Sequence, residues 1–305
     1  MTVSADPRKD FDLSVPRHPV DRVELVTGLR HLGLELDDRV IVHASLSSFG
    51  IVDGGARTVI EAVLEVIGTQ GTLMAPHYFS PHYEGVYDHH APPPTYTGTV
   101  PRVLRTWSGA VFSFHPSHPV AVLGKDAEHL IRDHYLVSAA GKDSPPDRLA
   151  KIGGKVLLLG VTQWVNTMIH VGEAYAGVPY WGQPHPDRRR GRWAITPDGR
   201  RVWVVLPETP GDSAGFHKID PFLIELGAIS FGLIGQARCR LMRAQALIDA
   251  AVEFLRLDPG SLLCDQPDCY YCPWAMQFLP DRAQVTQQVE EWPPVACTQV
   301  VQRKE

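Results

Sequence analysis

Residues 39–76 read RVIVHASLSSFGIVDGGARTVIEAVLEVIGTQGTLMAP, two apolar runs on either side of an amphipathic segment. The first run, residues 39–43, predicts a short buried strand, and residues 71–76 predict a second strand that stops at a proline. Between them, residues 56–67 carry apolar side chains at helical spacing after a loop rich in serine and glycine. A strand, a helix and a second strand in this order favour an α/β fold with part of its sheet parallel.

The rest of the chain continues to alternate between strands and helices. Residues 155–161, KVLLLGV, are the clearest buried strand, and residues 166–175 predict a helix directly after it. We expect further helices at residues 20–33, 99–106, 126–134, 216–226 and 239–257, and a further strand at residues 202–206. Because there is no internal repeat and no clean linker, we expect one domain at residues 20–263, a flexible lead at residues 1–19 and a cysteine-containing extension at residues 264–305.

The composition excludes several classes of protein. The chain has 305 residues, 44% of them hydrophobic, which is too many for a disordered protein. Its 29 basic and 34 acidic side chains give a net charge of −5, so the chain lacks the overall positive charge that attracts nucleic acid. No uninterrupted apolar run reaches the roughly 18 residues of a membrane helix, and the first residues lack the apolar core of a secretory signal. We expect a cytoplasmic protein that binds neither nucleic acid nor membrane.

A histidine and a glutamate three residues apart follow the clearest strand. His170 and Glu173 share one face of the predicted helix, where the carboxylate can orient the imidazole. A histidine oriented in this way suits general-base chemistry near neutral pH. The helix also follows the carboxyl end of a strand, where ligands of open α/β sheets bind. The alternative is an ordinary surface pair.

Two polar loops beside predicted strands are further candidates. Residues 42–48, VHASLSS, join a strand to a helix, so they form either an anion cradle or a serine-rich turn that caps the helix. They match neither the P-loop nor the dinucleotide-binding pattern. Residues 113–119, SFHPSHP, suit a phosphate, a substrate, a metal or only a structured loop. The histidines of residues 77–98 match no recognised metal motif.

Five stretches of the chain are similar, in order, to motifs of one known family. They are residues 42–76, SFHPSHPVAVLG at residues 113–124, SPPDRLAKIGGKVLLLGVTQWVNTMIHVGEAYAGVPY at residues 144–180, GFHKID at residues 215–220 and IGQARCRL at residues 234–241. Each match is weak alone, but five in sequence are specific. From about residue 20 to residue 263 the chain resembles the aminoglycoside 3-N-acetyltransferase family.

This resemblance implies a fold and a reaction. The fold is a single-domain antibiotic N-acetyltransferase-like α/β fold, with a central mixed sheet flanked by helices. The reaction moves an acetyl group from acetyl-CoA to an amine, for which the family implies the 3-amino group of an aminoglycoside antibiotic or a related aminosugar, and hence antibiotic resistance. A homodimer is also implied. The alternatives are another acyl-CoA, another amine from a biosynthetic pathway, or a non-catalytic binding protein on the same scaffold.

The resemblance also assigns roles to individual residues. His170 matches the catalytic histidine of the family, Glu173 matches its carboxylate partner, and His43 lines the same site. The loop that holds the coenzyme is matched by Ser45, Ser47, Gly54 and Gly55, and the loop that closes over it by Ser117 and His118.

Some residues depart from the family pattern. Pro119 stands where the family usually has serine, and Phe112 where it often has arginine, so a hydroxyl and a cation are absent from the predicted coenzyme site. Aminoglycosides are polycations that need an acidic pocket. The run of arginines at residues 188–190 argues against such a pocket nearby.

Three cysteines lie beyond the family match, in CDQPDCYYCPW. Cys264, Cys269 and Cys272 resemble half of a zinc knuckle, for which Cys239, a histidine or a carboxylate would supply a fourth ligand. Reduced structural cysteines and a disulfide are the alternatives, and a reducing compartment argues against the disulfide. A zinc-dependent nucleic-acid binder would also need a basic surface, which the chain lacks.

Overall fold

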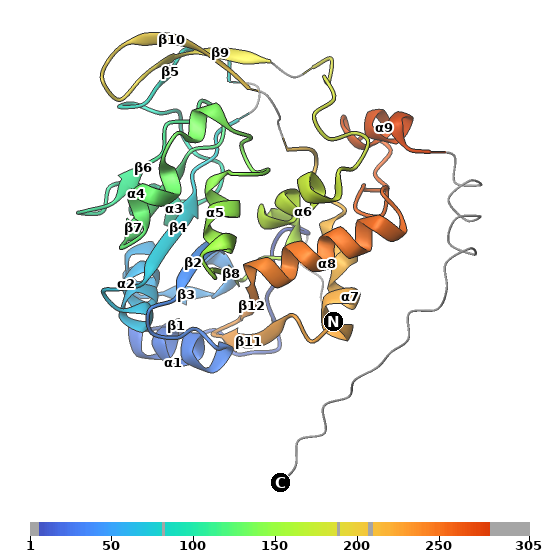
Figure 1. Ribbon diagram of the computed structural model, residues 1–305. Helices are drawn as coiled ribbons and strands as arrows, with labels where there is room; N and C mark the ends of the chain where they lie inside the picture. Colours follow the sequence, from blue (N-terminus) through green and yellow to red (C-terminus); the bar gives the residue numbers. More distant parts are fainter. Residues whose placement is uncertain (1–5, 81–82, 188–189, 207–209, 281–305) are drawn as a thin grey trace.

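The computed structural model describes residues 6–80, 83–187, 190–206 and 210–280, and its centre is a seven-stranded mixed sheet (Figure 1). In spatial order the strands are β11 (Ser230–Ile234), β12 (Ala237–Arg243), β8 (Lys155–Leu159), β2 (Arg39–Ala44), β4 (Thr72–Pro76), β7 (Val120–Gly124) and β6 (Val111–Phe112). The central strands β8, β2 and β4 run parallel, while the flanking strands pair antiparallel. The prediction of an α/β fold with a partly parallel sheet is confirmed.

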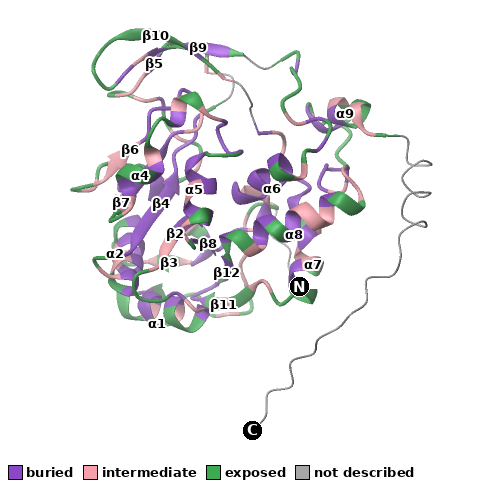
Figure 2. Cartoon of the chain, viewed as in Figure 1, coloured by how far each residue is buried: buried purple, intermediate pink, exposed green. Residues whose placement is uncertain are grey.

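Helices cover both faces of this sheet. One face packs against α1 (Arg22–Leu32), α2 (Ala56–Ile67) and α3 (Thr99–Arg105). The other packs against α4 (Ala127–Ile131), α5 (Pro145–Lys151), α6 (Met168–Ala176), α7 (Asp220–Glu225) and α8 (Ala244–Leu257). Successive side chains of β2 alternate between the two cores, because Val40 and Val42 face one and Ile41 the other. Buried residues therefore concentrate on the strands and on the inward sides of the helices (Figure 2).

The remaining elements are short. They are the strands β1 (Pro19–Val20) and β3 (Ile51–Val52), the helix α9 (Cys272–Ala275), and the 3-10 helices η1 (Leu46–Ser48), η2 (His134–Leu136), η3 (Gln163–Val165), η4 (Phe216–Ile219) and η5 (Met276–Phe278). Over the described part of the chain, no helix combines the length and hydrophobicity needed to cross a membrane.

A second, three-stranded sheet lies at the top of Figure 1, beyond the strand ends of the large sheet. It consists of β5 (Tyr87–Asp88), β9 (Gly191–Ile195) and β10 (Arg201–Val205). In the β9–β10 hairpin, Trp193 pairs with Trp203, and their ring centroids are 5.6 Å apart. The sequence predicts only β10 here, because the many charged residues around β9 hide its alternation. Of the arginine run, residues 188 and 189 lie outside the described residues.

The prediction of a helix over residues 239–257 is wrong at its start. Residues 237–243 form β12, which pairs with β8 on one side and β11 on the other, and α8 begins only at Ala244. Cys239 and Leu241 alternate along a strand and face one core, but they also continue the apolar pattern of α8. Short apolar runs next to a helix do not distinguish the two structures by periodicity alone.

The N-terminal segment is attached to the large sheet, although its composition predicts a loose lead. Lys9 and Phe11 form isolated bridges with Val161 and Ala237. The Asp10 carboxylate forms an ion pair with the guanidinium of the buried Arg240, in which Oδ2 of Asp10 lies 2.6 Å from Nη2 of Arg240. Residues 6–19 are therefore fixed by backbone pairing and a partly buried charge pair, and residues 1–5 lie outside the described residues.

Candidate active site

The motifs predicted from the sequence come together at one edge of the large sheet. Strands β2, β4 and β8 are parallel, so their carboxyl ends lie at the same edge. His43 is the second-to-last residue of β2, and α6 follows β8. Strand β7 starts opposite the end of β4, and the backbone N–H of His77 donates to the carbonyl of Pro119 at 2.9 Å. The loop of residues 113–119 is thereby held at this edge as well.

His170, Glu173 and Tyr180 form a buried chain of hydrogen bonds. Nδ1 of His170 lies 2.5 Å from Oε2 of Glu173, and both side chains are more than nine-tenths buried. The Tyr180 hydroxyl donates to Oε1 of Glu173 at 3.0 Å. Burial, followed by the neighbouring Glu173 charge, raises the pKa of Tyr180, so this hydroxyl stays a donor. Because a carboxylate only accepts hydrogen bonds, Nδ1 carries a proton in this contact, and Nε2 of His170 is the nitrogen left for proton transfer.

Tyr180 was not predicted as a site residue, because its place depends on where α6 ends. The helix stops at Gly177, whose φ of 64° lies in the left-handed region that glycine tolerates. The chain then turns, and the N–H of Trp181 donates to the carbonyl of Val178 at 2.9 Å. This turn brings Tyr180 back over the helix to Glu173.

The start of α6 is fixed by a chain of amide side chains. Oδ1 of Asn166 accepts from the N–H of Met168 at 3.1 Å, and its Nδ2 donates to Oε1 of Gln163 at 2.7 Å. Gln163 in turn donates to Oδ1 of Asp220 at 2.9 Å, at the start of α7. All of these amide groups are buried, so the orientation of α6, and with it of His170, is set by hydrogen bonds to a second helix.

Aromatic rings surround the His170 imidazole. The ring of Phe216, fully buried at the start of η4, lies edge-on to it with centroids 4.7 Å apart. The Trp181 ring lies at 6.5 Å. These rings exclude water from one side of the imidazole, which strengthens its interaction with Glu173.

His43 lies on the face of the sheet that α6 covers. It follows Ile41 by two residues, and Ile41 shares a core with Met168 and Ile169 of α6. Burial lowers the pKa of His43 to about 3, so the imidazole is neutral at physiological pH. Within the described chain, its Nε2 is buried without a hydrogen-bond partner. A buried nitrogen of this kind is suited to a bound molecule that supplies the missing partner.

The loop of residues 113–119 is organised around His115. Nδ1 of His115 accepts from the backbone N–H groups of Ser117 at 3.3 Å and His118 at 3.0 Å, and burial lowers its pKa to about 3. The Ser117 hydroxyl lies 2.8 Å from Nδ1 of His118. The His118 ring packs on the Tyr78 ring, with centroids 4.5 Å apart. The Tyr78 hydroxyl donates at 3.2 Å to Oγ1 of Thr167, the residue directly before α6. Tyr78, another residue not predicted from sequence, thus connects this loop to the start of the His170 helix.

The departure at Phe112 is partly compensated from another element. The Arg105 guanidinium, at the end of α3, lies over the Phe112 ring at 5.0 Å from its centroid. A cation is therefore present beside this position, although the chain lacks the expected arginine.

The residues predicted to hold the coenzyme fall into two local groups. The Ser45 and Ser47 hydroxyls lie 3.2 Å apart, and the backbone N–H groups of Ser45 and Ser48 already bond to Leu159 and Ser45 carbonyls. Gly54 and Gly55 have φ values of 73° and 63° and lead directly into the twelve-residue helix α2. A Cβ at Gly55 would meet no atom within 4 Å, so the space over this helix start is open.

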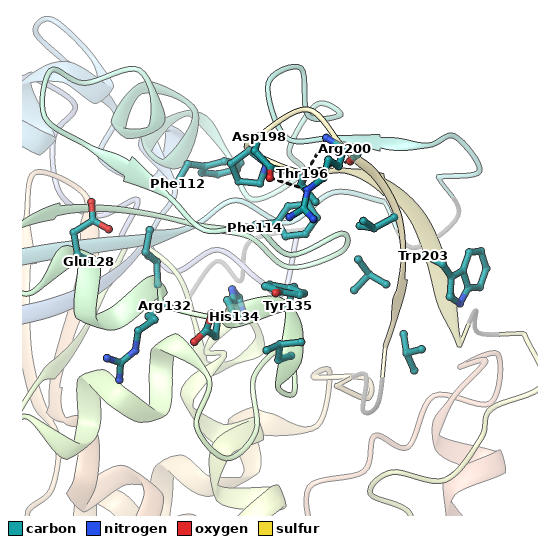
Figure 3. A pocket seen from close by; sticks show the side chains of 17 residues that line it. Phe112, Phe114, Glu128, Arg132, His134, Tyr135, Thr196, Asp198, Arg200 and Trp203 are labelled. Atoms are coloured by element: carbon teal, nitrogen blue, oxygen red, sulfur yellow. Dashed lines mark hydrogen bonds and ion pairs between the residues drawn. The ribbon is translucent and has the colours of Figure 1, made fainter.

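A cavity of about 1030 Å³ lies elsewhere, between η2 and the β9–β10 hairpin (Figure 3). Phe114, His134 and Tyr135 line one side, and Arg200 and Trp203 line the other. Neither His170 nor Glu173 nor His43 lines it. The catalytic candidates and this cavity are therefore separate features.

The structure gathers the three C-terminal cysteines into one cluster with a fourth group. The ligand atoms of Cys264, Cys269, Cys272 and Asp212 all lie within 4.8 Å of one another. Cys239 is elsewhere, buried in β12, where its thiol donates to the carbonyl of Ala237. Within the described residues, the fourth member of the cluster is a carboxylate, one of the open choices for the missing ligand. Asp212 was missed from the sequence because no local pattern links it to residues so far along the chain.

Comparison with known proteins gives consistent matches over most of the chain. The family model described as aminoglycoside 3-N-acetyltransferase matches residues 41–256. The chain is 35% identical over 237 residues to aminoglycoside N(3)-acetyltransferase VII of Streptomyces paromomycinus, covering 72% of this chain and 80% of that protein. It is 30% identical over 273 residues to aminoglycoside N(3)-acetyltransferase IX of Micromonospora chalcea, covering 78% of this chain and 94% of that protein.

Solved structures agree. A mutant of aminoglycoside acetyltransferase AAC(3)-IVa in complex with gentamicin is similar with a TM-score of 0.75 and 28% identity, covering 87% of this chain and 99% of that chain. The binary complex of AAC-IIIb with CoASH has a TM-score of 0.67 and 28% identity, covering 78% of this chain and 97% of that chain.

Proposed function

Since the chain belongs to the aminoglycoside 3-N-acetyltransferase family, and is an acyltransferase by that membership, we propose that it acetylates the 3-amino group of an aminoglycoside antibiotic, or of a related aminosugar, with acetyl-CoA. The observation that carries the proposal is the buried chain from Tyr180 through Glu173 to His170. It orients the imidazole through Nδ1 and leaves Nε2 as the nitrogen that can exchange a proton with the substrate. That is the requirement of an amine, which must lose a proton as it attacks a thioester.

The reaction proceeds by direct attack on the thioester. The amine nitrogen forms a bond to the acetyl carbon, its proton passes to Nε2 of His170, and the carbon–sulfur bond breaks. Glu173 stabilises the imidazolium that forms, at the 2.5 Å contact with Nδ1. The CoA thiolate leaves and takes up a proton, for which the imidazolium is the donor. His43, neutral because of its burial, offers a hydrogen-bonding nitrogen in the same region without adding a charge.

The coenzyme is assigned to the loops at the same edge of the sheet. Ser45 and Ser47 present hydroxyls, and Gly54 and Gly55 lead into the start of α2, where backbone N–H groups attract phosphate and the space beside Gly55 is open. The loop with Ser117 and His118 closes over the pantetheine arm. The similar fold of the AAC-IIIb complex with CoASH supports a CoA site in this scaffold. The similarity to the gentamicin complex of AAC(3)-IVa supports an aminoglycoside as acceptor.

The test is a thiol-release assay with acetyl-CoA and a panel of aminoglycosides. We expect His170→Ala to lower kcat by about 10²–10⁴, the usual contribution of a general base, with acetyl-CoA affinity by calorimetry largely kept. His129→Ala, on the exposed side of α4, is the matched control and keeps wild-type turnover. Near-wild-type turnover of His170→Ala overturns the mechanism.

The same assay separates the acceptor from the chemistry. Turnover with a non-aminoglycoside amine alone overturns the acceptor but not the transfer. Coenzyme binding without turnover across a broad amine panel points to a binding protein and overturns both.

We also propose that the protein is a homodimer and that it lies in the cytoplasm. The family resemblance supports the dimer, and the sequence supports the location. Light scattering after size-exclusion chromatography tests the assembly. A mass of about two 33.8 kDa chains supports it, and a mass of one chain overturns it.

A further inference from the structure

Four potential metal-binding groups meet at the C-terminal end of the fold, outside the catalytic machinery. They are the three thiols of Cys264, Cys269 and Cys272 and the carboxylate of Asp212. The thiols are reduced, and two of them are buried. Sγ of Cys272 lies 3.7 Å from Oδ2 of Asp212. In a tetrahedral zinc site with zinc–sulfur bonds of about 2.3 Å, ligand atoms lie about 3.8 Å apart, so only small movements separate this cluster from such a site.

We propose that Cys264, Cys269, Cys272 and Asp212 bind one structural zinc ion. A set of three thiolates and one carboxylate, with four ligand atoms and no open position, suits zinc better than magnesium or calcium, which prefer oxygen.

Backbone groups around the sulfurs fit bound thiolates. The N–H of Cys264 donates to Sγ of Cys272 at 3.2 Å, and the N–H of Cys272 donates to Sγ of Cys269 at 3.3 Å. Hydrogen bonds of this kind stabilise negative charge on sulfur and orient the ligand. The second of them closes the turn between two cysteines separated by two residues, which is the spacing of a zinc knuckle.

An ion pair flanks the cluster. Nζ of Lys218 donates to the carbonyl of Leu263 at 2.7 Å and pairs with the Asp265 carboxylate at 2.8 Å, so the ammonium lies against both neighbours of Cys264 in the chain.

The ligands come from two segments that also frame the active site. Asp212 precedes η4, and Phe216 of η4 packs on the His170 ring. Tyr271 is adjacent to Cys272, and its ring lies 6.4 Å from that of Tyr180, the partner of Glu173. A Cβ at Gly211 would collide with the Tyr271 ring, which shows how closely the two segments approach. By joining these two segments, the ion holds Phe216 against His170 and Tyr271 near Tyr180. It therefore helps to position the catalytic pair without touching the substrate.

The first measurement is the metal content of the full-length protein, purified without chelator and then titrated with zinc chloride. We expect one zinc per chain in the wild type and in Cys239→Ala, the matched control, because Cys239 lies outside the cluster. We expect Cys269→Ser and Asp212→Asn to bind zinc at least tenfold more weakly. Wild-type protein that holds no zinc after titration overturns the proposal, and so does a disulfide between two of the cluster cysteines found by mass spectrometry.

A second measurement avoids dependence on variants that fold poorly. Cobalt(II) substituted into the wild-type protein should give the intense visible bands of tetrahedral coordination and a thiolate charge-transfer band in the near ultraviolet. Weak octahedral bands overturn the assignment. Removal of zinc should lower the thermal unfolding midpoint and reduce kcat with little change in the KM for acetyl-CoA. Metal content and cobalt spectra are independent of turnover, so failure of the proposed activity does not affect this test.

Discussion

Replacement of Glu173 by glutamine tests the role proposed for His170 and Glu173. The glutamine side chain has nearly the shape of glutamate but carries no charge. The Tyr180 hydroxyl, which donates to Oε1 of Glu173 at 3.0 Å, holds the new amide oxygen toward itself and leaves the amide nitrogen facing His170. That nitrogen donates to Nδ1, so the imidazole proton moves to Nε2. Nε2 then has no lone pair for the proton of the amine.

The size of the effect follows from the geometry of the pair. With charge centres about 4 Å apart and an effective dielectric constant of about 20, the imidazolium and carboxylate attract by about 4 kcal/mol. This attraction exists only after proton transfer, so its loss raises the barrier and lowers kcat by about 10³. The wrong tautomer increases the loss further. The KM for acetyl-CoA should change little.

The assay is the rate of thiol release with acetyl-CoA and the aminoglycoside of the panel that the wild type acetylates fastest. Tyr180→Phe, which keeps the glutamate charge, should lower kcat about tenfold or less. In the double variant the amide introduced at position 173 is free to rotate and to present its oxygen to Nδ1, so Tyr180→Phe should partly rescue Glu173→Gln. A loss below about tenfold in Glu173→Gln, or two losses that simply add in the double variant, contradicts the proposed tautomer and the role of Tyr180.

Two further predictions concern stability. Burial holds the pKa values of His43 and His115 at about 3, and mainly burial holds the pKa of His134 well below 6.5, so the unfolded chain takes up more protons than the folded chain as the pH falls. At pH 5.5 this difference lowers the free energy of unfolding by about 1.4 kcal/mol for each of His43 and His115, and His134 acts in the same direction. We expect the thermal midpoint to drop between pH 7 and 5.5, with a shallower drop in His115→Asn. A midpoint that is level over this range contradicts the neutral buried histidines. At Gly172, between His170 and Glu173, a Cβ would lie 2.5 Å from Cβ of Ala251 on α8, so Gly172→Ala should destabilise the protein by about 1–3 kcal/mol in urea unfolding. An unchanged midpoint would show that α6 and α8 can move apart without cost.

The sequence predicts those helices and strands whose limits are marked by their own residues, through apolar periodicity, glycine or proline. Strand β2, helix α2 and strand β4 were predicted within a residue or so, because apolar periodicity and a final proline mark their limits. Helix α6 was predicted for the same reason, and so was the contact between His170 and Glu173, since these two residues are close in sequence.

Contacts between distant segments were not predictable in this way. The apolar pattern of β12 predicts the start of a helix, because the partner strands of β12, not its own pattern, make it a strand. Tyr180 depends on the turn after Gly177, and Asp212 depends on how the segment before η4 packs against the C-terminal residues. Each of these positions is fixed by tertiary packing, which overrides or adds to local preference.

The C-terminal residues beyond the last family motif affect where this chain can be shortened or fused. Cys264, Tyr271 and Ala275 are buried in the same core as Ile169 and Tyr180. A chain cut after residue 263 would expose apolar surface on the Tyr180 side and invite aggregation. A cut after residue 280 keeps that surface covered. Affinity tags and reporter fusions at this end should therefore leave residues 264–280 in place, even though the resemblance to the family ends earlier.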